Sequence, residues 1–479
     1  MLVKQSTDTF VRTSDNLGYV YNQKTKLERL YNETGVEYLK TLSRSPQNVV
    51  SIIRNTLLPL YYDASFEVIY EDFISFLKDL AHYGFIFLGH DEDELQNNEE
   101  CFYLNLNNNK FVNELHEEQT TIKKSTQEAI LDLTGEQPYL MSLQFELTSK
   151  CNERCIHCYI PNSKKDNGID LPFDLFKKVL DEFAEMGGLQ VSLSGGEIFM
   201  HQEINKIITY CREKDMQIVL LSNLLSFDDK NLDTIKKANI SMIQVSLYSM
   251  EEELHDKITT IKGSYKKTKE TIELLVKNDV PVMISCPIMK INSNSYHDIL
   301  EYAHSLGIKA QTDFILMGKE DMDTENLNNR IDLSETENVI REILHNEGVD
   351  SIDKIKNPQE LYPFKLSQPI CAAGRTNICV NANGNVTPCN GWQGMKAGNL
   401  YHSSLKEIWV NSQVLHDLRK ITRGSFRECV ECDAKDFCSL CLARNYNESN
   451  GNHLKINPHL CEISFLNKRI YEEMIGLIN

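Results

Sequence analysis

The sequence has no long hydrophobic run and no excess of positive charge, and each absence excludes a class of protein. No apolar stretch among the 479 residues approaches the roughly 18 residues of a membrane-spanning helix. The first residues, MLVKQSTDTFVRTSDN, lack the apolar core of a signal peptide. A net charge of −19 lacks the basic footprint of nucleic-acid binding. We therefore expect a cytoplasmic protein that binds neither membrane nor nucleic acid.

Cysteine, in contrast, is abundant, and its clustering indicates metal chemistry. The chain has 14 cysteines. Disulfides are rare in reducing compartments, where clustered cysteines more often bind metal or act in catalysis. Three of them, Cys151, Cys155 and Cys158, lie in the segment FELTSKCNERCIHCY. A structural zinc site closes with four ligands, whereas an iron–sulfur cluster on three thiolates keeps one iron open.

Residues 138–320 alternate between strand-like and helix-like patterns. Apolar strand segments occupy residues 140–148, 189–196, 216–223, 241–249, 280–289 and 308–317. Amphipathic stretches such as 172–187 and 264–279 lie between them. This alternation favours parallel strands joined by crossover helices, in an open sheet or a barrel. Chemistry in such folds collects at the carboxyl ends of the strands, and the cysteine triplet directly follows the first of them.

The triplet, with Tyr159 after it and Ser194-Gly195-Gly196-Glu197 at the end of the second strand, resembles the signature of the radical S-adenosylmethionine (radical SAM) enzymes. The resemblance implies an α/β fold with a partial (β/α)6 barrel of the TIM type. Its [4Fe–4S] cluster would be held by Cys151, Cys155 and Cys158, with S-adenosylmethionine on the fourth iron. The resemblance assigns cofactor contacts to Tyr159, Gly195, Gly196, Glu197, Ser222, Asn223 and Ser246. For the two serines, the alternative is that they only satisfy backbone groups at strand ends.

One segment departs from the family pattern. Relatives commonly carry an Arg-Gly pair after His-Asp in the stretch that matches residues 255–265, where this chain has Thr259 and Thr260. If that arginine holds the cofactor carboxylate in relatives, another cation must serve here. Lys262 is one candidate.

Seven further cysteines are patterned near the C-terminus. Their order resembles the SPASM extension of radical SAM enzymes, which binds two auxiliary [4Fe–4S] clusters; alone, it could also describe two zinc sites. The resemblance implies one auxiliary cluster on Cys429, Cys432, Cys438 and Cys461, and a nearer one on Cys371, Cys389 and Cys441. Cys379 could be a fourth ligand of the nearer cluster. We favour the alternative that Cys379 is a buried small hydrophobe, because it lies in a strand-plus-turn pattern.

Residues 1–95 form a separate small unit in this interpretation. Segments 18–22 and 26–32 are typical of a hairpin, and three helices follow, the second beginning at Ser45-Pro46 and the third carrying Phe73 to Leu80 on one face. The unit resembles the winged-helix domain with which peptide maturases hold the leader of a precursor. Binding would occur by strand addition at the edge Leu27–Leu30, facing the third helix.

These resemblances cover the whole chain and define its expected organisation. They imply a winged-helix recognition domain at 1–95, a linker at 96–137, the barrel at 138–320, a connecting segment at 321–370 and the SPASM domain at 371–479. The most similar class consists of sactipeptide and ranthipeptide maturases, which install thioether bridges between a cysteine sulfur and a carbon in ribosomally made peptides. Partners would be the precursor peptide and an electron donor such as ferredoxin or flavodoxin. Alternatives are a carbon–carbon crosslink, epimerisation, or a zinc-loaded peptide-binding scaffold.

Overall fold

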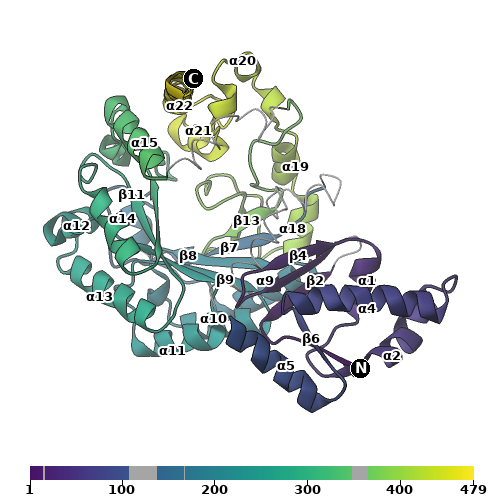
Figure 1. Ribbon diagram of the computed structural model, residues 1–479. Helices are drawn as coiled ribbons and strands as arrows, with labels where there is room; N and C mark the ends of the chain where they lie inside the picture. Colours follow the sequence, from purple (N-terminus) through teal and green to yellow (C-terminus); the bar gives the residue numbers. More distant parts are fainter. Residues whose placement is uncertain (14–16, 107–136, 167, 348–364, 479) are drawn as a thin grey trace. The chain divides into compact units, whose positions relative to one another are not determined.

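The computed structural model describes residues 1–13, 17–106, 137–166, 168–347 and 365–478 (Figure 1). The chain divides into two compact units, which are described one at a time. The first comprises residues 1–141 with the short segments 184–189 and 215–217, and the second comprises the remainder. No helix in the described part of the chain is both long and apolar enough to cross a bilayer.

The first unit contains two small antiparallel sheets and a set of helices. One sheet has the order β2-β3-β4 and the other β5-β1-β6. The strands are β1 (Leu2–Gln5), β2 (Thr9–Thr13), β3 (Gly18–Asn22), β4 (Glu28–Tyr31), β5 (Gln47–Asn48) and β6 (Ile86–Gly89). The helices are α1 (Thr34–Lys40), α2 (Val49–Ile52), the π-helix η1 (Ile53–Leu57), α3 (Leu58–Leu60), α4 (Phe66–His82) and α5 (Glu92–Asn105).

The hairpin and the third helix form where the sequence indicates, whereas the second helix starts later. Gln47 and Asn48 are extended because they pair with β1, so Asn48 rather than Ser45 caps α2, accepting a hydrogen bond from Ser51 N. The apolar face of α4 is buried at Phe73, Leu77 and Leu80, as its spacing predicts. Within the segment expected to be a linker, residues 96–105 complete α5, and residues 107–136 lie outside the described residues.

Strand β4 forms one edge of its sheet, as the proposed peptide-binding edge requires. Tyr31 at its end contacts the ring of Phe76 on α4 with centroids 5.0 Å apart, and its hydroxyl donates to Asp79 at 2.9 Å. Leu27 packs in the same core as Phe73 and Leu77 of α4, whereas Leu30 packs against a second cluster, so only part of the predicted edge Leu27–Leu30 faces this helix. The winged-helix assignment stays a prediction.

The second unit is built on one sheet of order β12-β11-β10-β9-β8-β7-β13-β14-β15. Its first six members follow the chain with parallel pairing and intervening helices, which confirms the predicted partial barrel (Figure 1). The strands are β7 (Ser142–Thr148), β8 (Gln190–Gly195), β9 (Gln217–Ser222), β10 (Met242–Ser246), β11 (Val282–Pro287) and β12 (Lys309–Asp313). The helices are α8 (Asn162–Asp166), α9 (Phe173–Glu185), α10 (Ile204–Glu213), α11 (Asp229–Ala238), α12 (Glu252–Thr259), α13 (Ser264–Lys277) and α14 (Tyr296–Ser305).

The C-terminal region continues the barrel sheet rather than forming a detached body. Strand β13 (Asn377–Val380) pairs parallel with β7, from Asn377 opposite Ser142 to Val380 opposite Phe145. The hairpin partners β14 (Asn385–Thr387) and β15 (Gly398–Asn399) extend this edge antiparallel. Residues 321–347 contribute the 3-10 turn η3 (Glu325–Asn329) and α15 (Leu333–Glu347).

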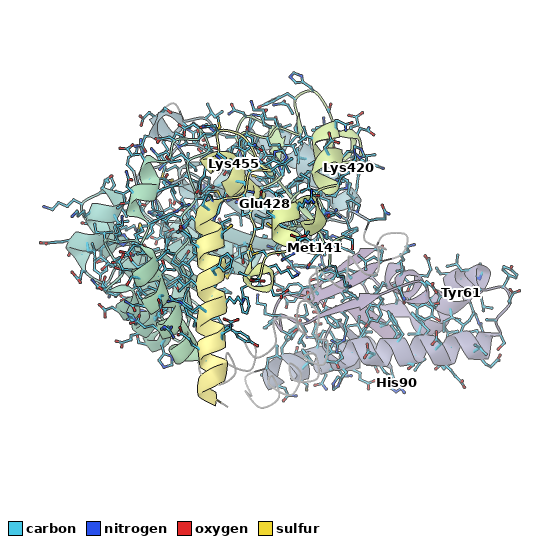
Figure 2. All side chains as sticks on the ribbon, turned by 90° about the horizontal axis from the view of Figure 1, so that it is seen from above. Tyr61, His90, Met141, Lys420, Glu428 and Lys455 are labelled. Carbon is cyan, nitrogen blue, oxygen red and sulfur yellow. The ribbon has the colours of Figure 1, made fainter. Side chains whose placement is uncertain are left out.

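Short helices complete the C-terminal region around a small core of its own. Trp392 is fully buried there against Leu418, Phe426 and Leu442. The helices are α18 (Leu405–Asn411), α19 (Gln413–Arg419), α20 (Arg427–Val430), α21 (Leu442–Glu448) and α22 (Pro458–Ile478), with 3-10 turns at η4 (Arg423–Ser425) and η5 (Lys435–Phe437). Figure 2 shows α22 as one uninterrupted helix, with Lys455 labelled shortly before its start.

Candidate functional site

The loop that carries the first three cysteines is anchored by backbone hydrogen bonds beyond the end of β7. The amide of Arg154 donates to Thr259 O, and the amide of Ile156 donates to Ile258 O, each at 3.1 Å. From η3, the side-chain amide of Asn329 donates to Ile156 O at 3.0 Å. The loop is therefore fixed by residues more than a hundred positions away in the sequence, which suits a site that must be formed before it binds a ligand.

The three thiols of this loop share one environment. Cys155 donates to Glu153 Oε2 at 3.1 Å, and the amide of Glu153 donates to Cys151 Sγ at 3.4 Å. The ammonium of Lys165 on α8 interacts electrostatically with the thiols of Cys158, Cys151 and Cys155. Burial raises the pKa of the Cys151 thiol to about 11. Iron binds the thiolate, so binding here must displace a proton from each of these thiols.

Two consecutive glycines let the end of β8 touch the cysteine loop. A Cβ on Gly196 would lie 2.2 Å from Lys150 O and 2.9 Å from Cys151 Cβ. Gly195 has a φ of +141°, and a Cβ on it would lie 2.3 Å from Thr148 O. The sequence predicts that these glycines permit close approach to a ligand. The structure shows that they also let the ends of β7 and β8 approach closely, because a side chain at either position would clash with residues 148–151.

Glu197 connects the ends of β8 and β9. Its carboxylate accepts from Ser222 Oγ and from Asn223 N, both at 2.7 Å, and from Phe199 N at 3.0 Å. Asn223 in turn donates from its side chain to Asn152 in the cysteine loop at 2.8 Å. Three of the residues assigned to the cofactor are therefore brought together around one buried carboxylate.

Ser246 lies at the end of β10, and Thr259 and Thr260 lie at the end of α12, in the segment where relatives carry an Arg-Gly pair. Ser246 ends β10 and its side chain hydrogen bonds with Tyr248, whose hydroxyl donates to Cys155 Sγ at 3.9 Å. Thr259 is buried and bonded to Ser264 Oγ at 2.7 Å, while Thr260 begins a left-handed turn with a φ of +64°. The cation candidate Lys262 is exposed.

Sequence reasoning missed a buried polar network at the inner face of β7. Tyr159 donates from its hydroxyl to Glu146 Oε1 at 3.1 Å, and Gln393 donates from Nε2 to Glu146 Oε2 at 3.0 Å. Asn390 donates to the Tyr159 hydroxyl at 3.3 Å. Burial raises the pKa of Glu146 to about 8, and the nearby Glu320 carboxylate adds to the rise. The signal that could have indicated it is the acidic Glu146 between the apolar residues Phe145 and Leu147 of a buried strand.

The C-terminal cysteines that the SPASM resemblance assigns to one cluster are electrostatic neighbours in the structure. Burial raises the pKa of Cys429 to about 11, and the neighbouring thiols of Cys438, Cys461 and Cys432 raise it further. The second group is Cys371, Cys389 and Cys441: burial raises the pKa of Cys389 to about 12, and the thiols of Cys441 and Cys371 add to the effect.

Cys379 has surroundings that differ from those of the two groups, because polar side chains are among its neighbours. It is fully buried on β13, with Gln393 Nε2 at 3.8 Å and Thr387 as side-chain hydrogen-bonding partners. Burial raises its pKa, and Glu146 and Cys389 contribute. Cys389 of the second group is therefore an electrostatic neighbour of Cys379.

The donor chemistry of these groups suits iron–sulfur clusters. Each group supplies only thiols, the ligands that such clusters use, and Gly196 places no side chain against Cys151. Within the described residues, no three Cys, His, Asp or Glu side chains converge closely enough to hold a single metal ion. Cys101, Cys211 and Cys286 do not belong to any group.

Comparisons with known proteins agree with this arrangement. Residues 145–306 match the family model for the radical SAM superfamily, and residues 371–433 match an iron–sulfur cluster-binding domain, SPASM. The chain is 28% identical, over 72% of its length and 75% of the relative's, to the antilisterial bacteriocin subtilosin biosynthesis protein AlbA of Bacillus subtilis. It is 26% identical to an AdoMet-dependent heme synthase of Methanosarcina barkeri, over 66% of this chain and 95% of that one.

Among solved structures, Streptococcus suis SuiB bound to its precursor peptide SuiA superposes with a TM-score of 0.63 at 15% identity. The superposition covers 96% of this chain and 99% of SuiB, so the two share a fold over nearly their full lengths. The matched domains imply [4Fe–4S] clusters and S-adenosylmethionine as cofactors. The chain thus carries a radical SAM domain followed by a SPASM domain, and its resemblance to radical SAM peptide maturases is confirmed.

Proposed function

We propose that this protein installs intramolecular thioether crosslinks, from a cysteine sulfur to a carbon, in a ribosomally made precursor peptide. One observation carries the proposal: two groups of only three thiols lie in one unit, and a buried network leads from one toward the other. Cys151, Cys155 and Cys158 form the first group, and Cys371, Cys389 and Cys441 the second. Three thiolates leave an iron open for a further ligand, at the first group for S-adenosylmethionine and at the second for a precursor thiolate.

We propose that the protein holds three [4Fe–4S] clusters. The third would be bound by Cys429, Cys432, Cys438 and Cys461. S-adenosylmethionine on a reduced cluster supplies one-electron cleavage of its sulfonium, which yields a radical able to remove a hydrogen from carbon. The side chains of this protein position the reactants. Glu197 holds the ends of β8 and β9 together, so that Ser222 and Asn223 present a fixed surface to the cofactor. Tyr159 and Ser246 complete that surface from the cysteine loop and β10.

Recognition of the precursor is proposed at the open edge of β4, through its leader. In the sheet β2-β3-β4, β4 pairs with β3 on one side, and Leu27 packs in one core with α4. A peptide substrate is supported by two of the similar proteins. AlbA is a biosynthesis protein of the bacteriocin subtilosin, and SuiB binds the precursor peptide SuiA. The AdoMet-dependent heme synthase among the relatives shows that similarity at this level does not fix the substrate. A ferredoxin or flavodoxin in a reducing cytoplasm would supply electrons.

The test is the mass and thiol content of a short candidate precursor, encoded beside this protein and co-expressed with it. A thioether removes two hydrogens and one thiol that iodoacetamide can alkylate. The variant Cys151/Cys155/Cys158→Ala must leave the peptide unchanged. Loss of two hydrogens with every thiol still alkylated would establish a carbon–carbon link instead, and an altered stereocentre without mass change would establish epimerisation. A colourless protein that carries zinc would refute the enzymatic proposal.

A further inference from the structure

A buried lysine lies beside the first cysteine group and is assigned no role by the motifs. Lys165 belongs to α8, seven residues after Cys158, and only 4% of it is exposed. Its ammonium hydrogen bonds with the thiol of Cys158 and interacts electrostatically with Cys151 and Cys155. All three proposed ligands of the radical cluster therefore face the same cation.

The neighbouring cations Arg154 and Lys164 have different partners. Arg154 pairs with Asp166, and Lys164 pairs with Glu320, both at 2.7 Å. Glu153, which accepts a hydrogen bond from Cys155, is a further neighbour of the Lys165 ammonium. Of the cations named here, Lys165 is the one that faces the thiols.

Burying an ammonium is costly unless opposite charge compensates it. A cluster on three thiolates carries net negative charge, and reduction adds one more electron. A cation fixed in a site of low dielectric constant lowers the energy of that added charge, so the reduction potential rises. The physical consequence of Lys165 is therefore an easier first electron transfer.

We propose that Lys165 is the charge partner of the radical cluster and favours its reduced state. The proposal rests on the proposed assignment of Cys151, Cys155 and Cys158 as cluster ligands. In the step concerned, an external one-electron donor is oxidised and the cluster is reduced by one electron, while Lys165 keeps its proton. Lys165 forms and breaks no covalent bond. It is a positioning residue that acts through the cluster.

The test is an anaerobic redox titration of the reconstituted full-length protein, without any peptide, for Lys165→Met and Lys164→Met. Both variants lose one positive charge from adjacent residues of the same helix, so bulk charge and helix content are matched. The radical cluster is identified as the one whose electron paramagnetic resonance signal changes when S-adenosylmethionine is added. We expect at least a tenfold less favourable reduction in Lys165→Met, which corresponds to 59 mV for one electron. Lys164→Met and Lys165→Arg should stay near the natural protein.

Three outcomes would overturn the proposal. The first is an equal potential in the two methionine variants. The second is a weaker affinity for S-adenosylmethionine at unchanged potential, which would assign Lys165 to the cofactor. The third is the loss of about four irons from Lys165→Met, which would make the lysine an assembly residue. Because no peptide is present, a failure of the thioether assay leaves this measurement unaffected.

Discussion

Gln393 donates a hydrogen bond of 3.0 Å to Glu146, across 247 residues of sequence. Glu146 also accepts from Tyr159, the residue that follows Cys158, while Gln393 lies four residues beyond Cys389. One carboxyl group therefore joins the loop of the first cysteine group to the loop of the second. A shift of either loop must disturb this network, because both oxygens of Glu146 are engaged.

The first prediction concerns the pH dependence of stability. Burial, with the Glu320 carboxylate adding to it, raises the pKa of Glu146 from 4.5 to about 8. A carboxyl with a raised pKa binds its proton more tightly in the folded state, so stability declines as pH rises from about 4.5 toward 8. Glu146→Gln removes this decline, and the natural protein should therefore lose more stability than the variant between pH 5 and about 8. Denaturant unfolding at both pH values measures it; equal changes in the two proteins would contradict it.

The second prediction tests the glycine contact beneath the cysteine loop. Gly196→Ala would place its Cβ 2.2 Å from Lys150 O, so the loop must move and the first cluster should fail to assemble. Iron content should fall by about four per chain. Gly307→Ala is the matched control: its φ of +67° strains alanine by about 1 kcal/mol, but nothing lies within 4 Å of the added Cβ. Full iron in Gly196→Ala would show that the loop adapts.

The third prediction is the iron count of the whole chain. Three [4Fe–4S] clusters require about twelve irons after anaerobic reconstitution, and Cys151/Cys155/Cys158→Ala should retain about eight. The variant should keep its brown colour but no longer cleave S-adenosylmethionine. Iron and sulfide analyses give both numbers. A natural protein with about four irons would instead restrict the clusters to the barrel.

The fourth prediction separates Cys379 from the ligands of the nearer auxiliary cluster. Its thiol is fully buried on β13, with Gln393 and Thr387 as side-chain hydrogen-bonding partners. Cys379→Ala should therefore keep all its iron, whereas Cys441→Ala should lose about four irons. Equal losses in both variants would make Cys379 the fourth ligand and close the site to a precursor thiolate.

The fifth prediction concerns the edge of β4. The amide of Asn22 donates to Leu27 O at 2.9 Å, so the alternation along an antiparallel pair directs the amide of Leu30 away from β3. Leu30→Pro removes this amide together with the side chain, and Leu30→Ala removes the side chain alone. Fluorescence anisotropy should show that a labelled leader peptide binds at least tenfold more weakly to the Leu30→Pro variant than to the Leu30→Ala variant. Similar affinities would place the leader elsewhere.

The parts of this protein that short sequence patterns encode were predictable. Strand periodicity located the six barrel strands, and the family resemblance assigned the cysteines to groups whose members are also electrostatic neighbours in the structure. The start of α2 was wrong because β5 pairs with β1, a partner that no local pattern shows. Gln393 was missed for the same reason, since its neighbour Glu146 is distant in sequence. No sequence pattern marks Lys165, because its burial depends on the folded chain.

The pairing of β13 with β7 has a consequence for biosynthesis. The first barrel strand receives its second neighbour only from residues 377–380, which leave the ribosome after the entire barrel. Until then β7 is an open edge of the kind that recruits other strands into aggregates. A chain that stops before residue 377 keeps that edge. Residues 377–380, which follow all six barrel strands in the sequence, thus complete the first of them, and truncations that remove these residues should yield insoluble protein.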